Sequence, residues 1–200
     1  MNAPSPVEST VSSIDMLLSR ASVSPRLLGE PGPDAAQLAL ILDAALRAPD
    51  HGNLKPARFI VIRGDARRRL GDMLAEATRR REPQAPQAVF EKHRSWPAVP
   101  PLVIAVGAKL HAGHAIPEIE QILSAGASAM NLLNAAHALG FAGMWVTGPN
   151  AYDPAVVRAL GLDEADRLIG FVGLGTPTNA TRPSPRKPDR QAYVSEWTGL

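Results

Sequence analysis

The chain has 200 residues, of which 45% are hydrophobic and 20% charged, with a formal net charge of +2. These values predict one globular domain, and the small net charge with only 4% aromatic residues argues against a nucleic-acid-binding surface. There is no cysteine, which excludes disulfides, thiol nucleophiles and cysteine-ligated metals and fits a reducing compartment without proving one.

The first part of the chain is expected to be a flexible arm over residues 1–12. It is polar and lacks the basic and apolar regions of a signal peptide, so we expect a cytoplasmic protein. Ser13 should cap a short helix ending near Arg20, followed by a proline- and glycine-rich loop over residues 21–33.

A second helix is predicted to begin at Asp34, which forms a capping box with Gln37. Its apolar stripe consists of Leu38, Ile41, Leu42 and Leu46. A loop rich in polar residues follows and leads directly into an apolar strand over residues 59–62. Loops of this kind often hold polar groups against a ligand.

The remaining elements alternate between helices and apolar strands. We expect helices over 65–81, 117–139 and 154–160, a proline-rich break over 82–87, and strands over 102–108, 142–146 and 168–174. The strand over 102–108 is apolar throughout, which predicts burial on both faces. The long helix carries too many polar residues for a membrane span, and the arginine runs 67–69 and 79–81 should be solvated. The pattern predicts an α/β or α+β sheet covered by helices.

Simple hydrolytic and metal-dependent chemistries have little support. His111 and His114 are three residues apart but have no third ligand in a recognised pattern, so no metal site is expected. Asp50 could orient His51 as a general base, but the side chains of neighbouring residues point in different directions on most backbones, so a hydrolase has little support. Gly173 and Gly175 resemble the start of a dinucleotide-binding turn, but Thr178 stands at the place of its third glycine, and a proline-rich tail follows where a helix is required.

Cations, hydroxyls and amides gather instead at the ends of the predicted elements. An FMN site needs cations for the phosphate, donors for the flavin carbonyls and positive charge near N1 and O2 of the ring. The residues that supply these groups are Arg20, Ala21 and Ser22, then Arg47, His51 and Asn53, then Trp145, Val146 and Thr147, and in the tail Arg182, Arg186 and Lys187.

Several sequence blocks, in this order, resemble the nitroreductase superfamily of FMN-dependent, NAD(P)H-oxidising enzymes, especially its small, minimal members. The resemblance spans residues 13–178 and is carried by residues 14–26, 46–51, 55–59, 124–132, 139–145 and 169–177. It implies an α+β fold with a central, mostly antiparallel sheet wrapped by helices, in an intertwined homodimer with FMN at the interface. The small residues 126–129 would permit close helix approach in that dimer.

The resemblance also implies a reaction and residue roles. Hydride would pass from NADH or NADPH to flavin N5 and then to a small-molecule acceptor such as a nitroaromatic or quinone, with no catalytic side chain required. Arg20, Ala21 and Ser22 would hold the phosphate and ribityl end; Arg47, His51 and Asn53 would contact flavin; Trp145, Val146 and Thr147 would line the ring or its ribityl chain; and Ala135, Ala136, His137, Ala138, Leu139 and Gly140 would contact NAD(P)H.

Three departures from the family pattern bear on these roles. Ala21 stands where a second basic residue is usual, so Arg26, Arg182 or Arg186 must supply that charge. Residues 55–57 read Lys-Pro-Ala in place of Gln-Pro-Trp, which removes a bulky wall, and the large insertions of longer members are missing.

Two other functions remain open: a protein that binds or processes flavin without NAD(P)H turnover, and a non-catalytic scaffold. Individually, Trp145 could belong to the core, Arg47 could stabilise a helix end and His51 could be a turn residue. The tail over 179–200 could pack on its own domain or on a partner subunit.

Overall fold

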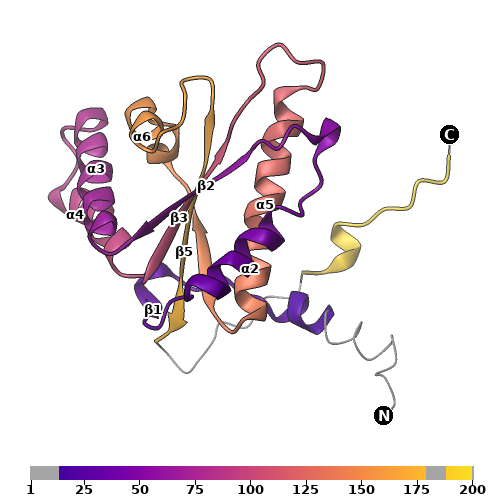
Figure 1. Ribbon diagram of the computed structural model, residues 1–200, viewed down its shortest axis with the longest axis horizontal. Helices are drawn as coiled ribbons and strands as arrows, with labels where there is room; N and C mark the ends of the chain where they lie inside the picture. Colours follow the sequence, from indigo (N-terminus) through magenta and orange to yellow (C-terminus); the bar gives the residue numbers. More distant parts are fainter. Residues whose placement is uncertain (1–13, 179–187, 200) are drawn as a thin grey trace.

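A five-stranded antiparallel sheet lies between two layers of helices in the computed structural model, which describes residues 14–178 and 188–199 (Figure 1). Its strands are β1 (Leu28–Gly29), β2 (Ala57–Arg63), β3 (Leu102–Ala108), β4 (Ala142–Val146) and β5 (Arg167–Pro177). The strand order is β1-β5-β3-β2, and β4 also pairs with β5. The predicted α+β fold with an antiparallel central sheet is confirmed.

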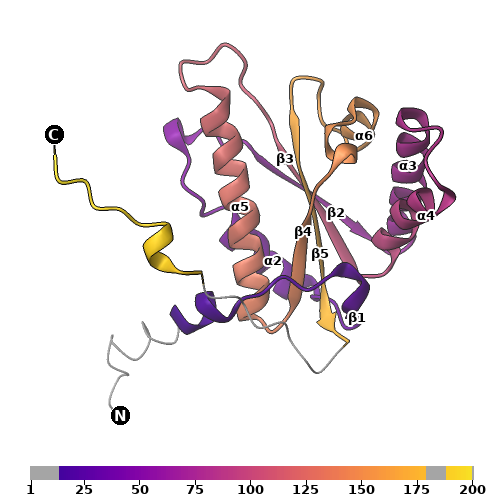
Figure 2. The same ribbon diagram turned by 180° about the vertical axis from the view of Figure 1, so that it is seen from behind.

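Helices cover both faces of this sheet. They are a short helix over 14–19, α2 (Ala35–Ala45), α3 (Asp65–Arg81), α4 (Gln87–Ser95), α5 (Glu118–Ala138) and α6 (Pro154–Ala159), with single turns η1 (Pro25–Leu27), η2 (His51–Asn53), η3 (Trp96–Ala98), η4 (Pro149–Tyr152) and η5 (Arg190–Ala192). Helices α2 and α5 lie on one face, and α3, α4 and α6 on the other (Figures 1 and 2).

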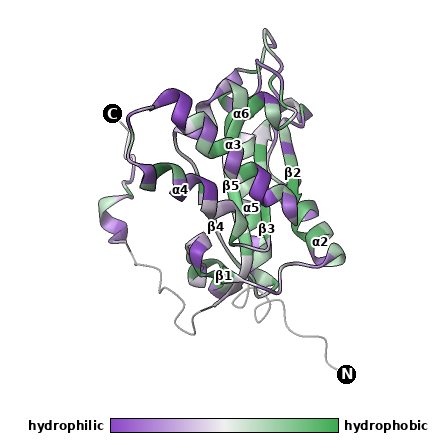
Figure 3. Ribbon diagram, turned by 90° about the vertical axis from the view of Figure 1, so that its left-hand side faces the viewer, coloured by the Kyte–Doolittle hydropathy of each residue, from purple (hydrophilic) through white to green (hydrophobic). Residues whose placement is uncertain are grey.

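Strand β3 explains this arrangement, because its side chains alternate between two apolar cores. Leu102, Ile104 and Val106 pack toward α2 and α5, whereas Val103 and Ala105 pack toward α3 and α6. All seven residues of β3 are buried, as their uniform hydrophobicity predicts. Figure 3 shows the strands as hydrophobic ribbons behind helices of mixed polarity.

The capping box of α2 is also confirmed: Asp34 accepts from the Gln37 N–H at 2.8 Å, and Gln37 accepts from the Asp34 N–H at 3.0 Å. The predicted apolar stripe of α2 included Leu46, which lies one residue beyond the end of the helix. Because the helix ends at Ala45, Leu46 becomes its C-cap and is 60% exposed.

Other boundaries differ from the predictions. Helix α4 was not predicted, since a proline-rich stretch precedes it and Phe90 is its one fully buried residue. Strand β5 runs through Pro177, and β1 lies in the predicted loop, because Leu28 pairs with Pro177. The arginine runs are not simply solvated, since Arg67 donates to the Ala98 carbonyl and Arg81 pairs with Asp153.

Some predictions fall at the ends of the chain. The arm over 1–12, and residues 179–187 of the tail with Arg186, lie outside the described residues. Residues 188–199 extend away from the sheet and helices in Figures 1 and 2, with Trp197 85% exposed. No helix within the described ranges is long and apolar enough to cross a membrane, and within them no three His, Asp or Glu side chains gather as metal ligands.

Candidate functional site

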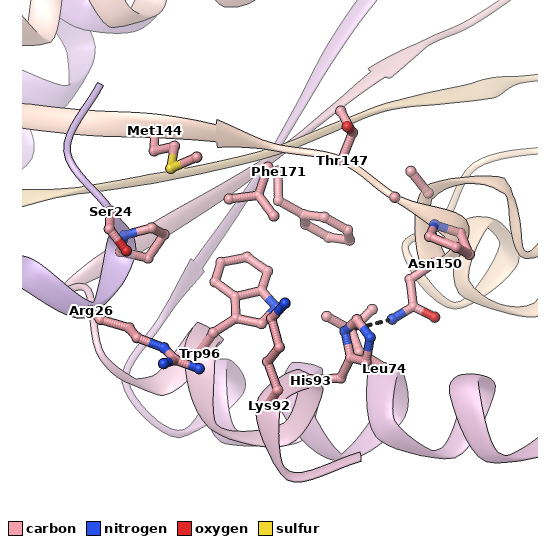
Figure 4. Close-up of a pocket in the computed structure, with 15 residues that line it drawn as sticks. Ser24, Arg26, Leu74, Lys92, His93, Trp96, Met144, Thr147, Asn150 and Phe171 are labelled. Atoms are coloured by element: carbon pink, nitrogen blue, oxygen red, sulfur yellow. Dashed lines mark hydrogen bonds between the residues drawn. The ribbon is translucent and has the colours of Figure 1, made fainter. Parts of the chain in front are cut away.

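A cavity of about 450 Å³ lies between α4 and the strands β4 and β5, on the α3 and α4 face of the sheet (Figure 4). This volume is within the range of small-molecule sites. Its lining residues are Ser24, Pro25, Arg26, Leu74, Lys92, His93, Trp96, Met144, Val146, Thr147, Gly148, Pro149, Asn150, Ala151 and Phe171. The walls are largely apolar, and the Trp96 and Phe171 rings meet edge to face with centroids 6.0 Å apart.

The alternation of β4 decides which predicted residues reach this cavity. Met144 and Val146 point into it, while Trp145 between them points to the opposite face. There its indole N–H donates to the Ile169 carbonyl at 3.2 Å. Trp145 therefore lines a second cavity, of about 650 Å³, beside α5.

The charge of the first cavity is positive. Arg26 and Lys92 line it, and no carboxylate occurs among its described lining residues. His93 adds no fixed charge, because burial, followed by the charges of Lys92 and Arg81, lowers the pKa of its imidazole. Cations over apolar walls suit a flat ligand that carries an anionic group.

Of the predicted site residues, Val146 and Thr147 line this cavity, whereas Arg20, Ala21 and Ser22 are not among its lining residues. The Val23 N–H donates to the Gly143 carbonyl at 3.1 Å, which holds the loop after the first helix against β4. Arg20, Ala21 and Ser22 immediately precede this contact, while Ser24 and Arg26 after it line the cavity with Val146 and Thr147.

Arg47, His51 and Asn53 do not join them within one chain. They follow α2, on the other face of the sheet, where His51 Nδ1 lies 2.6 Å from Glu120 Oε2 of α5. The backbone of this loop is unusual, because Gly52, Asn53 and Lys55 have φ values of 70°, 55° and 54°. The Asp50 carboxylate accepts from the Lys55 N–H at 2.6 Å and so holds the turn.

The segment expected to contact NAD(P)H is the end of α5. Ala136 is 1% exposed in the core and Ala135 packs against it, whereas Ala138, Leu139 and Gly140 are exposed. His137 Nε2 lies 3.1 Å from Ser19 Oγ and so joins the helix end to the residue before Arg20. Gly140 has φ 88°, as expected for a glycine that ends a helix.

Sequence reasoning missed Lys92, His93, Trp96 and Asn150. The first two lie on α4, which was not predicted, because its single buried residue, Phe90, gives no apolar stripe at helical spacing. Asn150 follows Thr147 closely in the sequence, but nothing in the sequence places it opposite α4.

Comparisons with known proteins agree with this architecture. The chain is 37% identical to "Putative NAD(P)H nitroreductase YdjA" of Escherichia coli K12, over 91% of this chain and 97% of that protein. A nitroreductase-like family protein from Bacillus cereus has the same fold, with a TM-score of 0.76 at 20% identity over the full length of both chains. A crystal structure of "a putative nitroreductase in complex with fmn" from Desulfovibrio desulfuricans gives a TM-score of 0.70 at 26% identity, again over both full chains. The model of the Nitroreductase family matches residues 17–176, and the chain therefore belongs to the nitroreductase family.

Proposed function

We propose that this protein is an FMN-dependent oxidoreductase that takes electrons from NADH or NADPH and passes them to a small oxidised acceptor. The observation that carries this conclusion is the cavity of about 450 Å³, which has cations and apolar walls and lies beside the loop after Arg20. The relative that is 37% identical is named as an NAD(P)H nitroreductase, and the 26% identical structure is described in complex with FMN.

The residues present fit FMN. Arg20 and Ser22 would hold the phosphate together with Arg26 at the cavity wall. Arg26 would thereby supply the positive charge that Ala21 lacks. Leu74, Trp96 and Phe171 offer apolar walls to the flavin ring, and Lys92 offers a cation to its polar edge. FMN supplies the electron-transfer chemistry, while the protein binds it, orients it and keeps water from the ring.

The visible spectrum of the purified protein tests this function. Flavin absorption bands that bleach when NADH or NADPH is added without oxygen, and return with a quinone or nitroaromatic, are the expected result. Bands that persist would favour the second candidate, a flavin-binding or flavin-processing protein without NAD(P)H turnover. A protein that stays colourless after reconstitution with FMN would exclude both.

We also propose that the protein works as a homodimer, and that α5 forms its interface. The outer face of α5 exposes Ile119, Leu123 and Met130 by 59%, 64% and 41%, at spacings that place them in one stripe. Of the small residues 126–129, Ser128 and Ala129 are buried within their own chain, which leaves Gly126 and Ala127 for the close approach.

A dimer also gives Arg47 and His51 a role. They lie on the face opposite the cavity of their own chain, so they would reach FMN only from the partner subunit. The exposed tail with Tyr193 and Trp197 is a second surface that the partner would cover. We further propose that the protein works in the cytoplasm, a reducing compartment with which a chain without cysteine is compatible. Cell fractionation tests that location.

Leu123→Glu should convert the dimer to a monomer, because it places a charge in the apolar stripe of α5. Sedimentation measures the mass directly. Val99→Glu, at a position 42% exposed beyond α4, is the control that should remain dimeric. A wild-type protein that sediments as a monomer at every concentration would contradict the dimer.

A further inference from the structure

His93 lies on the cavity wall at the end of a chain of polar contacts that begins at Arg81. Asn150, which is 6% exposed, stands between them. Arg81 Nη2 lies 3.2 Å from Asn150 Oδ1, and Asn150 Nδ2 lies 3.3 Å from His93 Nδ1. Figure 4 shows the second contact at the edge of the cavity.

These polar contacts fix the tautomer of His93, that is, which ring nitrogen carries the proton. A guanidinium can only donate hydrogen bonds, so the Asn150 atom that faces Arg81 must be the carbonyl oxygen. The amide nitrogen then faces His93 and also can only donate. Nδ1 of His93 must therefore accept, and a neutral imidazole that accepts at Nδ1 carries its proton on Nε2.

The groups around His93 keep the ring neutral. Lys92 is its neighbour on α4, and Arg81 and Glu82 lie at the end of α3. Burial has the largest effect on its pKa; it lowers the value, as do Lys92 and Arg81, and Glu82 opposes them. Asp153 at the start of α6 pairs with Arg81 at 3.4 Å. With the ordinary value at 6.5, a lowered pKa leaves His93 uncharged at neutral pH.

We propose that His93 gives a neutral Nε2–H hydrogen bond to a carbonyl oxygen of FMN in this cavity, and that Asn150 and Arg81 are its positioning residues. The inference rests on the proposed function, because it takes FMN as the ligand. Lys92 on the same wall provides the positive charge, and His93 adds a directional donor without a second charge. Asn150 is buried, so this donor is oriented before the ligand arrives.

Nuclear magnetic resonance of the ¹⁵N-labelled histidine rings tests the proposal, with and without FMN. We expect a neutral Nε2–H tautomer for His93 at neutral pH, and a shift of its Nε2 signal on FMN addition that His111 does not show. An Nδ1–H tautomer, or a His93 signal unmoved while the absorption spectrum reports bound FMN, would overturn the proposal alone. FMN that does not bind would overturn the proposed function as well.

Variants separate a ligand contact from a structural role. His93→Leu should weaken FMN binding about threefold to tenfold, the worth of one neutral hydrogen bond. His93→Gln retains an amide donor and should stay within about twofold of the wild type. His111→Leu, in an exposed loop, is the control and should have no effect.

Asn150→Asp places a carboxylate against Nδ1, so it should raise the pKa of His93 and move the neutral proton to Nδ1. Equal FMN affinity in His93→Leu, or an unchanged tautomer in Asn150→Asp, would contradict the proposal.

Discussion

At the scale of residues, the proposed FMN site combines groups that could be predicted from the sequence with groups that could not. Arg20 and Ser22 follow a predicted helix in an ordered set of blocks, so their residue types could be read directly. Lys92 and His93 could not be read this way, because a single charged or imidazole side chain carries no signal without the helix that directs it. Their place opposite Thr147 comes from tertiary packing.

Arg20→Ala should weaken FMN binding about tenfold or more, because a charge-assisted hydrogen bond to phosphate contributes roughly 1.5–3 kcal/mol. Titration of the stripped protein with FMN measures the affinity. Arg69→Ala, on the exposed side of α3, is the matched control and should bind FMN as the wild type does. An unchanged affinity in the Arg20 variant would mean that the phosphate lies elsewhere.

His93 also makes stability depend on pH. The pKa of His93 in the folded protein lies below 6.5, whereas in the unfolded chain it is about 6.5. At a pH between these two pKa values, the unfolded chain binds the proton and the folded protein does not. The free energy of unfolding should therefore rise with pH up to about 6.5 and fall as the pH drops through this window. Urea unfolding of the wild type and His93→Gln at about pH 5 and about pH 7.5 measures it. The variant should lose less stability on acidification, and an equal loss in both proteins would contradict the prediction.

At the scale of elements, prediction succeeded where a local pattern repeats. The capping box fixes the start of α2, and the unbroken apolar run of β3 fixes a strand buried on both faces. Prediction failed for α4 and β1, whose formation depends on distant partners. Helix α4 is held by its close approach to α3, and β1 exists because the end of β5 lies beside it.

Gly71 of α3 marks that close approach, because a Cβ there would fall on the Arg94 carbonyl of α4. Gly71→Ala should lower the free energy of unfolding by about 1–3 kcal/mol and should weaken FMN binding by displacing Lys92 and His93. Urea unfolding and FMN titration measure the two effects. The same control, Arg69→Ala, should change stability by no more than about 0.5 kcal/mol.

At the scale of the whole molecule, the sheet separates the predicted site into two parts. The family resemblance assigned Arg47 and His51 to the same ligand as Val146 and Thr147, yet within one chain His51 contacts α5 while Val146 and Thr147 line the cavity on the other face of the sheet. A linear sequence gives the order of these blocks but not the face on which each one lies. That face depends on how the helix next to each block packs on the sheet.

Occupation of the cavity should stabilise the entire fold, because FMN would bind the folded chain and not the unfolded one. At a free FMN concentration about 100 times the dissociation constant, the free energy of unfolding should rise by about 2.7 kcal/mol. Thermal unfolding monitored by circular dichroism measures the gain, and Arg20→Ala should need more FMN to reach it. A melting temperature that is independent of FMN would contradict specific binding.

The three tryptophans occupy three different surroundings: Trp96 in the cavity wall at 9% exposed, Trp145 on the opposite face, and Trp197 in the tail at 85% exposed. The chain therefore carries a built-in optical probe for each of its proposed contacts. Flavin absorbs in the region where indoles emit, so energy transfer would report a filled cavity most strongly through Trp96. Trp197 is exposed to water in the single chain, so its fluorescence emission would shift to shorter wavelength when a second chain covers the tail.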